Sequence, residues 1–178
     1  GRAPGAGGAG AGMWETDPMR VYLPALGSDL SAGRPPVRSG FAAAPERGAA
    51  PDDIEVLEDD AQTEAALASL ELLREAPPGE RSSRVVLAAD APVTTAGEKG
   101  ASRVVRVEPG TLGWGDVAAF LIDEDGAAEA VRAVLRAGDQ GAADRAVADL
   151  WEHPLEWFDI SERDALAAAW FPGRRDRG

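Results

Sequence analysis

The stretch RVVLAAD, residues 84–90, contains a continuous apolar run of the length of one β-strand. A strand that is apolar at successive positions has both faces covered, because neighbouring side chains point to opposite faces of a sheet. The run therefore predicts a buried, central strand. Two more strand-like runs follow, SRVVRVE at 102–108 and DVAAFLID at 116–123, and the three are candidates for consecutive neighbours in one sheet.

The clearest helix is predicted on the N-terminal side of this strand. Residues 56–75 read VLEDDAQTEAALASLELLRE, and Ala66, Leu70 and Leu73 fall on one stripe at helical spacing. Pro77 follows the last turn and prevents the helix from continuing.

Two strands are predicted before that helix. RVYLPA at 20–25 has β-branched and aromatic residues, and Pro24 indicates a strand accessible at a sheet edge. A weaker strand is centred on Phe41 within residues 38–45, and residues 45–53 are predicted to form a loop.

Helices dominate the C-terminal third. Apolar residues at helical spacing predict helices at 127–137 and 142–151, and a further short helix is expected from Ser161 to about Trp170. Between them, LEWFDI at 155–160 is typical of a strand.

These elements predict a single α/β domain of the α+β type. We expect a mixed sheet of five or six strands with helices mainly on one face, covered by the helix at 56–75 and the helix pair at 127–151. Residues 1–18 are interpreted as a disordered Gly/Ala-rich leader, 19–171 as the domain and 172–178 as a flexible basic tail.

Composition narrows the classes of function. A formal net charge of −13 disfavours binding to nucleic acids and anionic membranes. The absence of cysteine excludes a disulfide, a thiolate nucleophile and a cysteine-ligated zinc site. No apolar run approaches the length of about 20 residues that spans a bilayer, so a cytoplasmic location is expected.

Three carboxylates are candidates for a divalent metal site. Asp90 closes the first long apolar strand, and Asp123 and Asp125 close the last one. If these strands ran parallel and adjacent, the carboxylates would meet at one edge of the sheet and offer oxygen ligands to Mg²⁺ or Mn²⁺. The competing interpretation is that aspartate commonly ends strands and starts turns.

Other patterns point to chemistry only weakly. His153 is the only histidine, and neither a GxSxG elbow nor a cysteine accompanies it. Lys99, the only lysine, is interpreted as a solvated loop residue, and the glycines 110, 113 and 115 as turn residues. The GxGxxG match at residues 5–10 lacks a preceding strand, so no dinucleotide or other cofactor is predicted.

The aromatic residues suggest a binding surface. Trp170 and Phe171 end the last helix before the basic tail, where they would dock either on the domain itself or on a partner. Trp151 and Trp157 are interpreted as core residues from their helical and strand phases.

Five blocks of the sequence, in order, resemble a known family. They are MRVYLPA (19–25), EDDAQTEAALASLELL (58–73), RVVLAADAP (84–92), DVAAFLIDE (116–124) and LEWFDISE (155–162). Together they resemble a family of small uncharacterised actinobacterial proteins classed as a domain of unknown function, over roughly residues 19–165. The resemblance implies a cytoplasmic α/β domain and brings no catalytic residues. Its members usually have a longer first helix than GSDLSAGRPP (27–36) allows here.

The leading hypothesis is a non-catalytic protein-interaction or regulatory domain. The alternative is a divalent-metal-dependent enzyme that uses Asp90, Asp123 and Asp125. A third hypothesis is a homo-oligomer formed through an exposed strand edge near residues 20–25.

Overall fold

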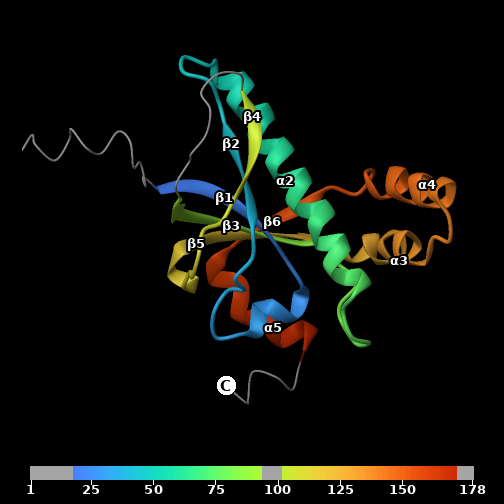
Figure 1. Ribbon diagram of the computed structural model, residues 1–178. Coiled ribbons are helices and arrows are strands. Elements are labelled where there is room, and N and C mark those ends of the chain that lie inside the picture. The colour runs from blue at the N-terminus through green and yellow to red at the C-terminus, as the bar shows by residue number, and fades with distance from the viewer. Residues whose placement is uncertain (1–17, 94–101, 172–178) are drawn as a thin grey trace, which may run out of the picture.

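The computed structural model describes residues 18–93 and 102–171, which form one α+β domain. Its centre is a six-stranded sheet in the order β4-β2-β1-β3-β5-β6, and every ladder between neighbours is antiparallel (Figure 1). The strands are β1 (Pro18–Ala25), β2 (Gly40–Ala44), β3 (Val85–Pro92), β4 (Arg103–Val107), β5 (Val117–Asp123) and β6 (Leu155–Asp159). The α-helices within the described residues are α2 (Pro51–Arg74), α3 (Ala128–Arg136), α4 (Gln140–Leu150) and α5 (Arg163–Trp170).

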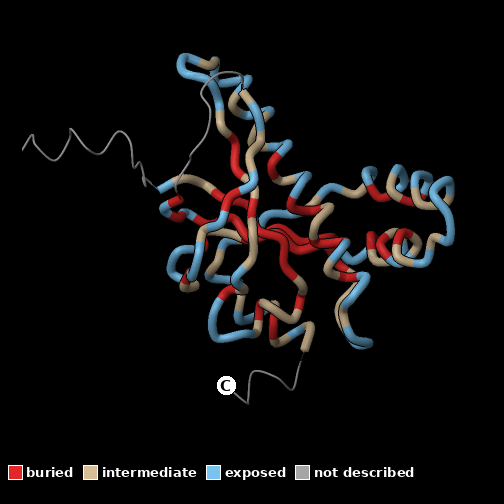
Figure 2. The backbone as a smooth tube through the Cα atoms, viewed as in Figure 1, coloured by how far each residue is buried: buried red, intermediate tan, exposed pale blue. Residues whose placement is uncertain are grey.

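The expected fold class is confirmed, and β3 is the buried strand that its apolar run predicts. Residues 85–89 of β3 are fully buried, and Figure 2 shows the buried positions concentrated where β1, β3 and β5 cross the centre of the molecule. Val85 and Leu87 face one apolar layer while Val86 and Ala88 face the other. This alternation explains why residues 85–89 are apolar at every position.

Helix α2 covers one face of the sheet, over β1 and β2. Ala61, Ala65 and Ala66 pack there against Tyr22 and Val86. The small alanine side chains allow the helix to approach the strands closely.

Helix α2 begins earlier than its sequence pattern predicts. Its first residue is Pro51, followed by Asp52 and Asp53 in the first turn. Proline is favoured at the first position of a helix and anions are favoured near its N-terminus. The last three residues of the predicted loop, 51–53, are therefore helical, whereas residues 45–50 lie outside any helix or strand.

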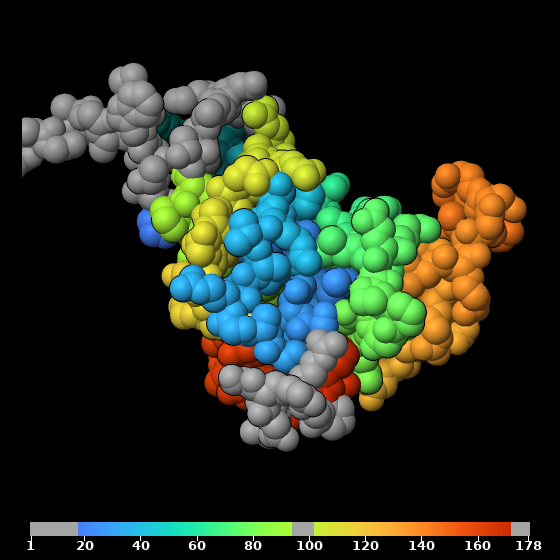
Figure 3. Space-filling model, turned by 60° about the horizontal axis from the view of Figure 1, so that its bottom comes forward, coloured from blue at the N-terminus to red at the C-terminus, as the bar shows by residue number. Residues whose placement is uncertain are grey.

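The opposite face is covered by α5 and by a short 3-10 helix at Gly27–Ser31. Leu30, Ala167 and the partly buried Trp170 pack against the apolar layer that contains Phe120. Figure 3 shows α5 lying directly against this N-terminal segment. The helices are therefore divided between the two faces.

Helices α3 and α4 form a hairpin that does not cover the sheet. They pack on each other and on the C-terminal half of α2, where Leu70 and Leu73 meet Val131 and Val134. Figures 1 and 3 show this hairpin projecting away from the body of the domain. The expectation that residues 127–151 cover the sheet is therefore wrong, because the apolar side chains of these helices pack against each other and against α2.

The strand order also differs from the sequence expectation. β4 pairs with β2 at one edge of the sheet, whereas β3 and β5 are neighbours on the other side of β1. β1 itself lies between β2 and β3, so residues 20–25 do not offer an open edge and cannot carry the edge-to-edge oligomer. The sheet is antiparallel where a mixed sheet was expected.

Gly40 at the start of β2 tests the close packing of this sheet. A Cβ atom there would lie 2.6 Å from Val21 Cγ1 and 3.0 Å from the Tyr22 backbone oxygen. We expect Gly40→Ala to lower the free energy of unfolding by roughly 1–3 kcal/mol, the usual cost of overpacking. The matched control is Gly33→Ala, because nothing lies within 4 Å of a Cβ at that position. Equal urea midpoints for the two variants would contradict this packing.

Candidate functional site

The structure separates the candidate metal ligands. Asp90 and Asp123 each lie toward the C-terminal end of their strand, and because β3 and β5 are antiparallel these positions lie at opposite ends of the strand pair. Asp123 lies beside Arg84, and the strand from position 84 to position 90 spans roughly 20 Å. Metal–oxygen bonds are only about 2.0–2.6 Å long, so one ion cannot bind both carboxylates. Within residues 18–93 and 102–171, no three or more His, Asp or Glu side chains come together in a way that could hold a metal ion.

Each of these carboxylates instead contacts an arginine. Asp90 Oδ1 lies 2.9 Å from Arg20 Nε, and Asp125 Oδ1 lies 3.1 Å from Arg81 Nη2. The first pair is partly exposed, and in the second pair the Asp125 side chain is almost fully exposed. The pairing with Asp90 raises the pKa of Arg20, so this guanidinium stays charged.

The third pair, Arg84 with Asp123, is buried. The two side chains are only 2% and 1% exposed. Arg84 Nη2 donates to Asp123 Oδ1 at 2.6 Å and Arg84 Nε to Asp123 Oδ2 at 3.0 Å, a two-pronged contact. The Arg84 backbone amide also donates to the same carboxylate, at 2.8 Å. A planar guanidinium suits this geometry, because it presents parallel donors to a carboxylate.

Two serines complete the polar network around this pair. The Ser83 hydroxyl accepts a hydrogen bond from the Asp123 amide and donates to the Arg84 carbonyl. The Ser69 hydroxyl of α2 accepts from the Val85 amide and donates to the Ala25 carbonyl. These hydrogen bonds join β3 to β5 and tie α2 to the sheet, and they give the two buried serine hydroxyls both a donor and an acceptor role.

His153 lies at the outer side of this network. Its Nδ1 is 3.1 Å from Glu124 Oε2, and its carbonyl oxygen accepts a hydrogen bond from Arg84 Nη2 at 2.8 Å. The guanidinium of Arg84 also lies 5.9 Å from the ring of Trp151. His153 therefore fixes the connection between α4 and β6, which is the role of a turn residue.

Tyr22 forms a second polar contact between α2 and the sheet. Its hydroxyl donates to Glu58 Oε1 at 2.6 Å. Burial, together with this hydrogen bond to a carboxylate, raises the pKa of Tyr22 to about 12. The phenol therefore stays protonated and serves as a hydrogen-bond donor.

The last aromatic residues dock on the domain itself, which is one of the two alternatives that the sequence leaves open, whereas two tryptophans expected in the core are exposed. Trp170 packs inside the domain: Arg81 lies 4.6 Å from its ring centroid, and a Cβ on Gly27 would lie 3.1 Å from the ring. Phe171 is half-buried beside it. In contrast, Trp151 is 46% exposed and Trp157 is 50% exposed, so placing these two in the core is wrong.

Trp151 and Trp157 lie on the same face of the sheet. Trp151 covers Arg84, which binds Asp123, and Asp123 is paired in register with Leu155 of β6. Trp157 follows Leu155 by two positions, so both side chains point to one face. We call the surface formed by Trp151, Leu155 and Trp157 the tryptophan surface. The alternation of residues in the sequence could not identify the tryptophan surface, because LEWFDI carries apolar residues on both faces of the strand.

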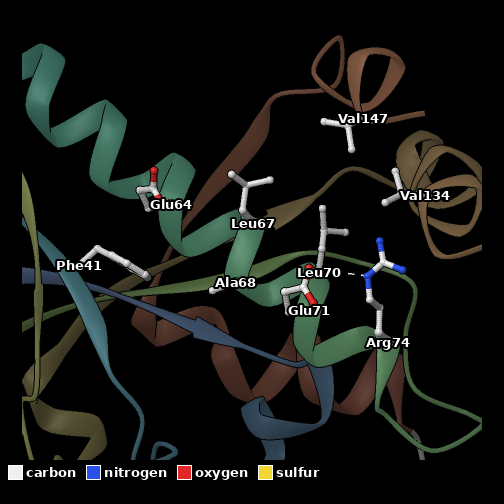
Figure 4. Close-up of a pocket in the computed structure, with 9 residues that line it drawn as sticks. All are labelled: Phe41, Glu64, Leu67, Ala68, Leu70, Glu71, Arg74, Val134 and Val147. Atoms are coloured by element: carbon white, nitrogen blue, oxygen red, sulfur yellow. Dashed lines mark ion pairs between the residues drawn. The ribbon is translucent and has the colours of Figure 1, made fainter. Parts of the chain in front are cut away.

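A shallow groove of about 350 Å³ runs along the outer side of α2 (Figure 4). Figure 4 shows Leu67 and Leu70 of α2 on one side and Val134 and Val147 of the α3–α4 hairpin on the other. Its charged groups are carboxylates and Arg74, which pairs with Glu71 at 3.7 Å. The groove therefore lacks the converging acid, base and nucleophile of a catalytic site.

Several residues singled out in the sequence add no chemistry. Gly110 has a positive φ of 76°, and Gly113 opens a short 3-10 turn, so the glycine cluster forms turns. Lys99 and the GxGxxG match, like most of the leader and the basic tail, lie outside the described residues.

Fold and contacts together define a small α+β domain built on one antiparallel sheet, with its strand-end carboxylates engaged by arginines. The chain belongs to a family of unknown function, DUF6912, whose model matches residues 19–167. Searches among curated proteins and among solved structures gave no match. Over the part of the chain that is described, no helix has the length and apolarity needed to cross a membrane.

The buried pair predicts that Asp123 contributes far more than Asp90 to the free energy of unfolding. Asp123→Ala leaves the Arg84 charge buried without a partner, so we expect the free energy of unfolding to fall by about 3–5 kcal/mol. Asp90→Ala breaks a partly exposed pair and is expected to cost about 1 kcal/mol or less. Urea denaturation of both variants measures the difference. Similar losses for the two would show that Arg84 and Asp123 are not buried together.

The Tyr22 contact predicts a loss of stability in alkali. Its pKa is higher in the folded protein than the ordinary value of 10.0, so stability is fully present below pH 10 and falls as the pH rises to about 12. We expect a loss of about 2 kcal/mol across this window. Tyr22 is the only tyrosine, so near-ultraviolet absorbance follows its ionisation directly. Tyr22→Phe should flatten the profile, and an unchanged profile would contradict the assignment.

Proposed function

We propose that this protein is a non-catalytic protein-interaction domain that binds its partner through the tryptophan surface. The observation that carries the proposal is the exposure of Trp151 and Trp157, about half of each side chain. Leu155 lies between them in the sequence, begins β6 opposite Asp123 and is only partly buried. Tryptophans of this kind are the residues that most often anchor protein interfaces.

The position of these side chains on an uncovered part of the sheet supports a role in binding. β6 packs extensively only on β5 among the described elements, and α2 lies over β1 and β2 instead. Among the described residues, therefore, no helix packs extensively on the face of β6 that carries Trp157. An apolar surface left uncovered in this way is typical of a site that another molecule covers.

The contacts of the ionisable groups argue against catalysis by the candidate carboxylates and His153. Asp90, Asp123 and Asp125 are each engaged by an arginine, and Asp90 lies far from Asp123. His153 contacts Glu124 and supports a turn. The net charge of −13 also disfavours a nucleic-acid or anionic-membrane partner, which leaves another protein in the cytoplasm as the expected partner.

A comparison of two exposed apolar residues tests this proposal. Trp157→Ala removes the main anchor and should abolish capture of a stoichiometric partner from a lysate of the source organism. Val56→Ala is the matched control, since Val56 is 58% exposed on α2 and lies outside the tryptophan surface. Both variants should stay folded by circular dichroism, with stability losses of about 1 kcal/mol or less. A wild-type protein that captures no partner, or equal capture by both variants, would refute the proposal.

A further inference from the structure

We propose that the partner docks as an extended, basic segment that adds to the outer edge of β6 and continues the sheet. This inference rests on the proposed function, because it specifies the kind of partner that the tryptophan surface accepts. Strand addition of this kind takes affinity from backbone hydrogen bonds and specificity from alternate side chains.

The outer edge of β6 is the first requirement. β6 ends the strand order, and its ladder partner is β5, from Asp123↔Leu155 to Ala119↔Asp159. Among the residues that the structure describes, no other strand pairs with it. An edge of this kind presents backbone donors and acceptors to an incoming chain.

The capping contact at the end of β6 shows which backbone groups point outward. The Asp159 amide donates to Glu162 Oε2 at 3.3 Å instead of to β5. Backbone groups of an antiparallel strand alternate between inward and outward pairs, so Leu155 and Trp157 share the outward direction with Asp159. The Glu162 carboxylate occupies the Asp159 amide, so Leu155 and Trp157 remain as the positions where a new strand would pair.

The charge of the edge selects a basic occupant. Glu152, Glu156 and Asp159 are exposed along β6 and the turn before it. Hydrogen bonds from the hydroxyl and amide of Ser161 lower the pKa of Asp159, which keeps that carboxylate ionised. The neighbouring Arg163 does not offset these charges at the edge, because its guanidinium donates to the Leu30 carbonyl and stacks on Trp114.

The same charges disfavour a second copy of β6 as the occupant. The strand LEWFD at 155–159 carries two acidic residues and no basic one, so pairing of identical edges would bring carboxylates together. Like charges opposite each other destabilise a sheet. The acidic residues therefore protect the edge against self-association while leaving it open to a segment of opposite charge.

The side chains of β6 predict a pattern in the partner segment. Leu155 and Trp157 point to one face of the sheet and Glu156 to the other. A paired strand would place apolar side chains beside Trp157 and basic side chains beside Glu156. The expected segment therefore alternates between apolar residues and Lys or Arg.

Selection from a library of random peptides tests the inference without knowledge of the natural partner. The intact protein is immobilised, and bound peptides are sequenced after several rounds. We expect enrichment of peptides in which apolar residues alternate with Lys or Arg. Enrichment of peptides with helical i, i+3, i+4 spacing, enrichment of acidic peptides, or no enrichment would overturn the inference.

Two controls locate the binding of a selected peptide. Glu156→Lys should weaken it by about tenfold or more, whereas Glu55→Lys makes the same charge change on α2 and should leave the affinity unchanged. N-methylation of the alternate peptide amides that face β6 should abolish binding, and methylation of the other set should not. Equal effects of the two charge variants, or of the two methylated sets, would overturn strand addition.

The outcome separates this inference from the proposed function. If lysate capture depends on Trp157 but selected peptides tolerate both methylation patterns, the protein binds a partner by another geometry and only the strand inference fails. If Trp157→Ala captures the partner from the lysate as well as the wild-type protein does, the proposed function fails as well. A molar mass that rises with concentration in light scattering, and falls on Glu156→Lys, would assign the edge to a second copy and overturn the inference.

Discussion

The buried ion pair between Arg84 and Asp123 is the contact on which the arrangement of this domain depends. Two charges with almost no exposed surface are stable only when each is paired and hydrogen-bonded. Here the guanidinium meets the carboxylate through two nitrogens, and the backbone amide of Arg84 adds a third donor. A shift of register between β3 and β5 would separate these groups and leave both charges buried alone. The pair therefore favours one register of the central strands, with a precision that apolar packing of Val and Ala residues does not supply.

The same pair positions the tryptophan surface. Arg84 also donates to the His153 carbonyl, which anchors the chain as it leaves α4 and enters β6. Trp151 lies over the guanidinium, and Leu155 begins β6 opposite Asp123. The structural core and the proposed binding surface thus share one set of contacts. Variants of Arg84 or Asp123 are accordingly expected to affect binding through the position of β6, and not through any direct contact with the partner.

Much of the secondary structure follows from the sequence, whereas the sheet topology does not. The apolar run at 85–89 predicts a doubly covered strand, and the stripe of Ala66, Leu70 and Leu73 predicts α2. Strand neighbours are determined by contacts between distant segments, so three strands consecutive in the sequence proved not to be consecutive in the sheet. The carboxylate hypothesis depended on parallel strands and therefore failed with the topology. Trp157 was misplaced for a related reason: alternation shows that a strand has two faces, but not that α2 lies over β1 and β2 and leaves the same face of β6 uncovered.

The central claim is that β6 is an open edge beside an exposed tryptophan, and amide hydrogen exchange tests it most directly. In the free protein, the amides of Leu155 and Trp157 point outward and those of Glu156 and Phe158 point toward β5. Nuclear magnetic resonance should therefore show fast exchange at Leu155 and Trp157 and slow exchange at Glu156 and Phe158. Uniform protection of all four amides would mean that another segment already covers this edge, and would contradict the account.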